Sequence, residues 1–224
     1  MGKINSLTKA EAIELAFKIG FEGEANRFDC AQEVFHAISS VLGIKNPLIF
    51  KCLSALEAGG AITTCGSCGA FSGALVAFGY FFGRSYDLWE EGRMVIKSSI
   101  LGQKLYKKFE EQYGSVICRN IHKKIFGRTF ELMDSKNLGI NKEELEAFNK
   151  MGAHENMCPT VVGLSAAWAV EILWDEIPKD KDISGIKDMT SIFLMSYLSQ
   201  SLPTTILLTS KKNNPTKRIM PIRL

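Results

Sequence analysis

The fold of this chain is decided by one uncharged stretch, Ala58-Gly-Gly-Ala-Ile-Thr-Thr-Cys65-Gly-Ser-Cys68-Gly-Ala-Phe-Ser-Gly73-Ala-Leu-Val-Ala-Phe-Gly79-Tyr-Phe-Phe-Gly83. No Asp, Glu, Lys or Arg occurs in these 26 residues. Gly69, Gly73 and Ala77 are spaced by four, so on a helix they form one stripe of small residues. Because such a stripe lets another backbone approach closely, we expect this helix at the centre of an all-α, multi-helix bundle.

The same stretch carries a Cys-x-x-Cys motif before its apolar part. Thr64 or Ser67 can cap the helix start, which places Cys65 and Cys68 in or beside the first turn. Free N–H groups and the positive end of the helix dipole favour a thiolate there. The sequence therefore predicts two reactive sulfur atoms at the start of a buried helix.

Two other interpretations of the stretch stay open. A run of 26 uncharged residues could cross a membrane, although its many Gly, Ser and Thr residues favour a buried core helix. The two cysteines could also be packing residues, because free cysteine is among the most buried residue types.

Length and composition are those of a soluble globular domain. The chain has 224 residues, of which 46% are hydrophobic and 23% charged, which is ordinary for such a protein. A net charge of +3 is too small to indicate a nucleic-acid partner. No signal peptide is visible, so we expect a cytoplasmic protein in which the six cysteines are reduced, bind a metal or perform redox chemistry.

Capping and helix-breaking residues divide the chain into helices. Thr8 and Glu11 form a capping box, and Gly20 and Gly23 are expected to end that first helix near Lys18. Further helices are expected at residues 28–42, from Pro47 to Gly59-Gly60, from Cys65 to Gly83, between Ser85 and Gln112 in one or two pieces, from Ser115 to Gly127, and at residues 141–150, 158–174 and 187–201. The expected N-terminal caps of four of them are Ser85 or Asp87, Ser115, Asn141 and Cys158. We expect one cysteine-rich helical domain at residues 1–177, interrupted by an insertion at 128–157, and a C-terminal extension at 178–224.

Four motifs that each carry a cysteine follow one another in the chain. They are Asp29-Cys30-Ala-Gln-x-Val, Cys68-Gly-Ala-Phe-Ser-Gly73-Ala-Leu, Tyr-Gly-Ser-Val-Ile-Cys118-Arg and Cys158-Pro-x-x-Val-Gly. Over about residues 10–175 this set resembles the redox-active protein family named for its Cys…CGAxxG…Cys…Cys signature, the C-GCAxxG-C-C family. The resemblance implies a mainly helical fold and a redox role for Cys30, Cys68, Cys118 and Cys158.

The chain departs from that signature in three respects. It has an additional cysteine, Cys65, it carries the 128–157 insertion before the last cysteine, and it has the C-terminal extension. A related arrangement occurs in the split-Soret cytochromes. Here Gly69 follows Cys68 where covalent attachment of haem c needs histidine, so no covalent haem c is expected.

Three functions are compatible with these cysteines. Soft sulfur ligands suit an iron–sulfur cluster or another thiolate-bound metal, so the first is electron transfer or redox chemistry at such a centre. Its candidate metal ligands are Cys30, Cys65, Cys68, Cys118 and Cys158, and all of these except Cys65 form the expected cofactor-binding set. The second is a cofactor-free thiol–disulfide protein with Cys65 and Cys68 as the catalytic pair. The third is a helical interaction scaffold with structural cysteines.

We expect an oxidoreductase or an electron-transfer protein, and the residues do not decide between the two. We expect a redox partner protein. We do not expect the chain to bind a nucleic acid or to span a membrane. The glycine stripe could pack within the chain or across a homodimer.

The three histidines and Arg119 are weaker candidates. We expect His36 beside the inward face of its helix, His122 in a basic patch with Lys123 and Lys124, and His154 exposed to solvent. Arg119 could support a neighbouring thiolate or pair with a carboxylate.

Overall fold

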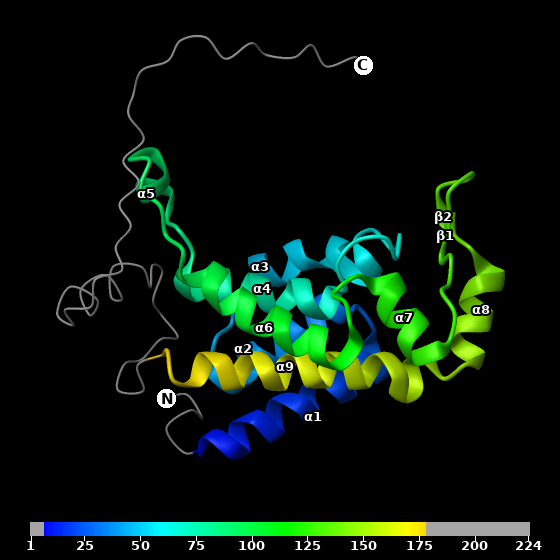
Figure 1. The fold of residues 1–224 in the computed structure, drawn as a ribbon, viewed down its shortest axis with the longest axis horizontal. Coiled ribbons are helices and arrows are strands. Elements are labelled where there is room, and N and C mark those ends of the chain that lie inside the picture. The colour runs from blue at the N-terminus through cyan, green and yellow to red at the C-terminus, as the bar shows by residue number, and fades with distance from the viewer. Residues whose placement is uncertain (1–6, 178–224) are drawn as a thin grey trace, which may run out of the picture.

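The computed structural model describes residues 7–177, and Figure 1 shows their arrangement. Helices make up 71% of these residues, and the strands form one two-stranded ribbon, which confirms the all-α class. The α-helices are α1 (Lys9–Arg27), α2 (Cys30–Leu42), α3 (Pro47–Cys52), α4 (Gly69–Phe82), α5 (Tyr86–Glu90), α6 (Lys97–Tyr113), α7 (Cys118–Phe126), α8 (Lys142–Lys150) and α9 (Cys158–Trp174). A 3-10 segment, η2 (Leu53–Gly59), a π-helical turn, η3 (Ala153–Met157), and the strands β1 (Met133–Asp134) and β2 (Gly139–Ile140) complete the set.

Helices α1, α2, α4, α6 and α9 form the bundle. Helix α1 lies along α9, and α2 packs against α1, α4 and α9 (Figure 1). The apolar helix α4 contacts α2, α6 and α9, so the uncharged stretch lies in the middle of the bundle. Its small residues allow this, because a Cβ atom added at Gly73 would overlap the backbone carbonyl of Ala31 in α2.

The start of α4 differs from the sequence-based prediction. The helix begins at Gly69 with Cys68 at its N-cap, and neither Thr64 nor Ser67 caps it. Thr64 has a positive φ of 57° and its hydroxyl donates to the carbonyl of Thr63, so its side chain is not directed at the helix. Cys65 therefore lies in the loop before α4 and outside its first turn.

The prediction that glycines end the first helix near Lys18 was wrong. The capping box of Thr8 and Glu11 is present, but α1 continues to Arg27 through Gly20 and Gly23. These glycines serve packing, because a Cβ atom at Gly20 would lie 3.3 Å from the Val162 carbonyl oxygen of α9. Burial against a neighbouring helix offsets the roughly 1 kcal/mol that glycine costs inside a helix.

Several other boundaries follow the sequence. The polar segment after Gly83 is two helices, α5 and α6, and Ser85 caps the first of them. Asn141 caps α8 as expected. Ser115 does not cap α7, which begins at Cys118, but its hydroxyl accepts a hydrogen bond from the Ile117 amide. The helix expected at 187–201 and the whole 178–224 extension lie outside the described residues.

Within residues 7–177, one continuous helical segment, Ala153–Trp174, is long and apolar enough to cross a membrane by length and composition. Within the bundle, 67% of its apolar window is buried against other helices, and the core helix of a soluble protein meets the same criterion. The expectation of no transmembrane span stays a prediction.

Candidate functional site

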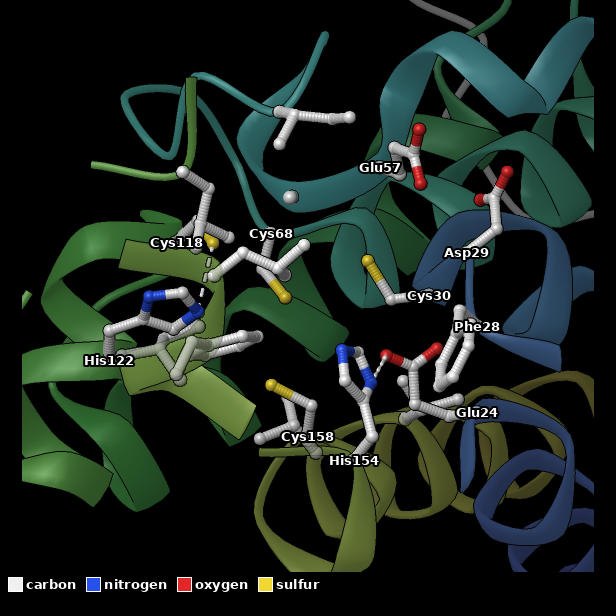
Figure 2. Close-up of a pocket in the computed structure, with 18 of the residues that line it drawn as sticks. Glu24, Phe28, Asp29, Cys30, Glu57, Cys68, Cys118, His122, His154 and Cys158 are labelled. Carbon is white, nitrogen blue, oxygen red and sulfur yellow. Dashed lines mark hydrogen bonds and ion pairs between the residues drawn. The ribbon is translucent and has the colours of Figure 1, made fainter. Parts of the chain in front are cut away.

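Cys30, Cys68, Cys118 and Cys158 line one cavity of about 280 Å³ at the end of the bundle where α8 and the ribbon lie (Figures 1 and 2). The four residues come from the starts of α2, α4, α7 and α9, which are separated by 38 to 50 residues in the chain. All six cysteines of the chain are free thiols in the structure. The structure thus brings the four signature cysteines to one place.

A left-handed turn before α2 positions Cys30. Phe28 and Asp29 have positive φ values of 62° and 65°, and the Asp29 carboxylate accepts a hydrogen bond from the Gln32 amide at the helix start. Cys30 is then the first residue of α2 and lies beside Gly69, whose missing side chain leaves room for the Cys30 Sγ atom. The glycine after Cys68 therefore creates the space that the Cys30 sulfur occupies.

Backbone hydrogen bonds between two loops hold Cys68 and Cys118 side by side. The Cys68 amide donates to the Val116 carbonyl at 2.8 Å, and the Cys118 amide donates to the Gly66 carbonyl at 3.0 Å. These bonds belong to an isolated antiparallel bridge between Ser67 and Ile117. The bridge therefore fixes the start of α4 relative to the start of α7.

A π-helical turn delivers Cys158. The prediction that Cys158 is a helix N-cap was wrong, because η3 runs directly into α9 and Met157 occupies that position. Cys158 is the first residue of α9 and Pro159 follows it. A π-turn rotates the residues before it relative to those after it, and such turns occur frequently at functional sites.

The other two cysteines lie elsewhere. Cys65 is exposed, does not line the cavity, and its Sγ atom accepts a hydrogen bond from the Arg119 guanidinium. Cys52 is exposed at the end of α3. A ligand role for Cys65 stays a prediction, and the structure does not bring it together with the four cavity cysteines.

His122 is buried and not part of a basic patch, so that expectation was wrong. Its side chain belongs to the inward side of α7 and packs against the rings of Phe126, Phe130 and Phe148. Its Nε2 atom lies 3.5 Å from Cys118 Sγ, and its Nδ1 atom has no hydrogen-bond partner. Burial lowers the pKa of His122 to about 4, so the ring is neutral at physiological pH.

His154 is also less exposed than expected. Its side chain is 24% exposed, its ring contacts Phe28 with centroids 4.4 Å apart, and its Nδ1 atom lies 3.7 Å from the Glu24 carboxylate. That distance is too long for a hydrogen bond, and Glu24 Oε2 also has no partner. Burial raises the pKa of Glu24 to about 8, with smaller contributions from the charges of Glu33, Asp29 and Glu57.

Strained backbone surrounds the cavity. Four non-glycine residues that line it have positive φ values, namely Phe28, Asp29, Ala58 and Ile62. Each such residue costs about 1–3 kcal/mol, and these conformations cluster at ligand and catalytic sites. The conformation of the cavity wall therefore lowers the folding stability of the protein, as is common around ligand and catalytic sites.

The thiols of Cys30, Cys118 and Cys158 hold their protons more tightly than free cysteine does. Interaction with the Cys68 thiol is the largest cause that raises the pKa of Cys30, and burial raises the pKa values of Cys118 and Cys158. A bound metal centre would replace those protons, since metal ligation deprotonates thiols. Within residues 7–177, no three His, Cys, Asp or Glu side chains converge closely enough to hold a single metal ion.

A family model described as "Putative redox-active protein (C_GCAxxG_C_C)" matches residues 28–172, which is more than half of the chain. The chain belongs to this family. The match begins two residues before Cys30 and ends beyond Cys158, so it spans all four cavity cysteines of this redox-active family member. No curated protein and no solved structure matches the chain.

Sequence reasoning missed Glu24 and misjudged the burial of His122 and His154 in this family member. One signal could have identified Glu24, because Ala12, Ala16 and Gly20 form a buried row at spacing four on α1 and Glu24 continues it. A carboxylate in line with small packing residues indicates a buried charge. No comparable signal exists for His122, whose burial depends on phenylalanines from the 128–157 insertion.

Proposed function

We propose that this protein transfers electrons at an iron–sulfur centre held by Cys30, Cys68, Cys118 and Cys158. The observation that carries the proposal is that these four sulfur-bearing side chains, from four separate helices, line one cavity. Membership of a redox-active family supports it.

The donor set fits an iron–sulfur cluster. Four thiolates are the usual ligands of [2Fe–2S] and [4Fe–4S] clusters. A cluster distributes its ligands over several irons, so its thiolates stand further apart than those around one zinc ion. Four sulfur donors spread around one cavity are the arrangement that a cluster needs, and this is the ground on which a cluster is proposed.

When bound, such a centre would supply one-electron transfer at a potential set by its surroundings. The protein's own residues provide those surroundings. His122 can hold a hydrogen bond at the Cys118 sulfur, and the aromatic cluster behind it excludes water from that side. Hydrogen bonds to cluster sulfurs and burial are among the means by which a protein tunes such a potential.

Anaerobic purification followed by an absorption spectrum and assays of iron and sulfide tests the proposal. We expect a coloured protein with iron and sulfide in equal amounts. Cys30→Ser, Cys68→Ser, Cys118→Ser and Cys158→Ser should each lose colour and iron, whereas the matched control Cys52→Ser should keep both. A colourless, iron-free protein after anaerobic purification and attempted reconstitution would refute the proposal.

A cofactor-free dithiol is the second candidate, and the contact between Cys30 and Cys68 favours it. Oxidation would join these two sulfurs in a disulfide and release two protons and two electrons to an oxidant, for which oxidised dithiothreitol serves in the test. The exposed Cys65 beside Arg119 would be the alternative partner of Cys68. Counting free thiols in Cys30→Ser and Cys65→Ser before and after mild oxidation separates the two pairs. Oxidation should lower the number of free thiols by two unless the replaced cysteine is the disulfide partner of Cys68.

A further inference from the structure

The cavity has two chemically different sides. Figure 2 shows the sulfur atoms of Cys68, Cys118 and Cys158 on one side and the carboxylates of Asp29, Glu24 and Glu57 on the other, with Cys30 between them. The proposed centre uses the sulfur side together with Cys30. The carboxylate side has no part in it.

The carboxylate side lacks a permanent counter-charge, because the His154 ring 3.7 Å from Glu24 has a pKa that burial lowers. Of the described residues that line the cavity, none is Lys or Arg. The neighbouring Arg27 is bound through Nε and Nη2 to Glu33 at 2.9 and 2.7 Å, so its charge is already paired. Burial is the main cause that raises the pKa values of Asp29 and Glu57, and a neighbouring carboxylate raises each further.

Glu24 is the residue that indicates a ligand. It is only 3% exposed, it lines the cavity, and its Oε2 atom has no hydrogen-bond partner. Native proteins pair almost all buried polar atoms, and an unpaired carboxylate oxygen in a cavity is an acceptor that a bound donor would satisfy. This observation is independent of the number of acidic residues nearby.

The remaining wall decides the class of ligand. Much of it is apolar, including Leu132, Leu145 and Phe148 from the insertion, so the ligand has an apolar part. Phe28 is 50% exposed and stacks edge-on against His154 next to Glu24, and an aromatic face beside a carboxylate is a setting that stabilises an ammonium group. A volume of about 280 Å³ is just under the range of drug-sized pockets, which indicates a small molecule.

We propose that the carboxylate side of the cavity binds a small organic cation, an amine with an apolar body, with its ammonium group on Glu24 and its approach guided by Asp29 and Glu57. Binding of this ligand depends on the cavity wall alone. Its assignment as the substrate or electron acceptor of the thiol site rests on the proposed function.

Two size-matched thiol reagents of opposite charge test this selectivity on metal-free protein. Replacing Cys52 and Cys65 by Ser leaves the four cavity cysteines as the only thiols. Their reaction with trimethylammonioethyl and sulfonatoethyl methanethiosulfonate is then timed at about pH 8.5, where Glu24 is largely ionised. Each thiolate attacks the reagent's sulfenyl sulfur, forms a mixed disulfide and releases methanesulfinate.

We compare the rate of reaction with the cationic reagent to the rate with the anionic reagent, and divide this ratio by the same ratio for free 2-mercaptoethanol. The normalised ratio should exceed about ten. Glu24→Gln should lower it about three- to tenfold, as expected when one unit charge a few ångströms away is removed. Glu57→Gln should lower it less and serves if Glu24→Gln folds poorly. Glu22→Gln, on the exposed side of α1, is the matched control and should change nothing. A normalised ratio near one, or equal ratios for Glu24→Gln and Glu22→Gln, would overturn the proposal.

Calorimetry with benzylamine and its neutral analogue benzyl alcohol provides the second measurement. We expect the amine to bind at least about tenfold more tightly, and Glu24→Gln to remove that difference. Equal binding of the two compounds, or no binding of either when the thiols also fail to react, would refute the cation site. Because both measurements use metal-free protein, an iron-free preparation leaves their outcome unaffected.

Discussion

Replacing Gly73 by Ala tests how closely α2 and α4 approach beneath the cysteine cavity. The added Cβ atom would overlap the Ala31 carbonyl oxygen of α2 and lie 3.0 Å from the carbonyl carbon. A backbone group in the middle of a packed helix cannot rotate away as a side chain can. The helices must therefore separate, which moves the element that begins with Cys30.

The magnitude follows from two opposing effects. Overpacking a well-filled core costs about 1–3 kcal/mol, and contact with backbone places Gly73→Ala at about 3. Alanine recovers about 1 kcal/mol relative to glycine inside a helix. The free energy of unfolding should therefore fall by about 2 kcal/mol, which lowers the urea midpoint by about 1 M for a typical denaturant slope.

Gly79→Ala is the matched control on the same helix. Its Cβ atom would meet nothing within 4 Å, so only the helix-propensity gain remains and stability should rise by about 1 kcal/mol. Equilibrium urea unfolding of both variants measures the difference, which we expect to be about 3 kcal/mol. Equal effects of the same sign would show that α2 and α4 do not approach as described.

Three further outcomes are expected. The pKa of Glu24 is about 8 in the folded protein, above its unfolded value, so the group's contribution to stability is complete below about pH 4.5 and is lost as pH rises through 8. Glu24→Gln should remove this loss of up to about 1.4 kcal/mol per pH unit, and parallel urea stability–pH curves for the two proteins would contradict it. Gly69→Ala places a Cβ atom on Cys30 Sγ, so iron content of the anaerobic protein should fall although no cysteine changes; full iron content would argue against Cys30 as a ligand. Arg27→Met leaves the nearly buried Glu33 carboxylate unpaired and should lower the unfolding free energy by about 1–3 kcal/mol in urea, whereas a neutral result would mean that this ion pair contributes nothing.

The sequence predicted the fold class and most helix positions because these depend on local rules, whereas the four cavity cysteines were singled out by the family resemblance. Capping residues and apolar spacing give helices, and the small residues of α4 give a close helix contact. Thr8, Ser85 and Asn141 all cap the helices assigned to them. Gly20 and Gly23 led to a wrong end for the first helix, because these glycines allow close packing against neighbouring side chains and backbone and do not break the helix.

The surroundings of the cysteines could not be predicted in the same way. The bridge that holds Cys68 beside Cys118 joins two loops about fifty residues apart, and no local pattern specifies it. The insertion supplies Phe130 and Phe148, which bury His122, although the insertion itself was expected only as an interruption. Site chemistry that depends on contacts between distant segments requires the folded structure.

Iron K-edge X-ray absorption on the anaerobically purified protein tests most directly whether the four cysteines share one centre. We predict a first shell around iron made only of sulfur, with a second iron scatterer close by, in the wild-type protein and in Cys52→Ser alike. An iron shell of oxygen and nitrogen, or protein that binds no iron while Cys30, Cys68, Cys118 and Cys158 are all reduced, would contradict the account.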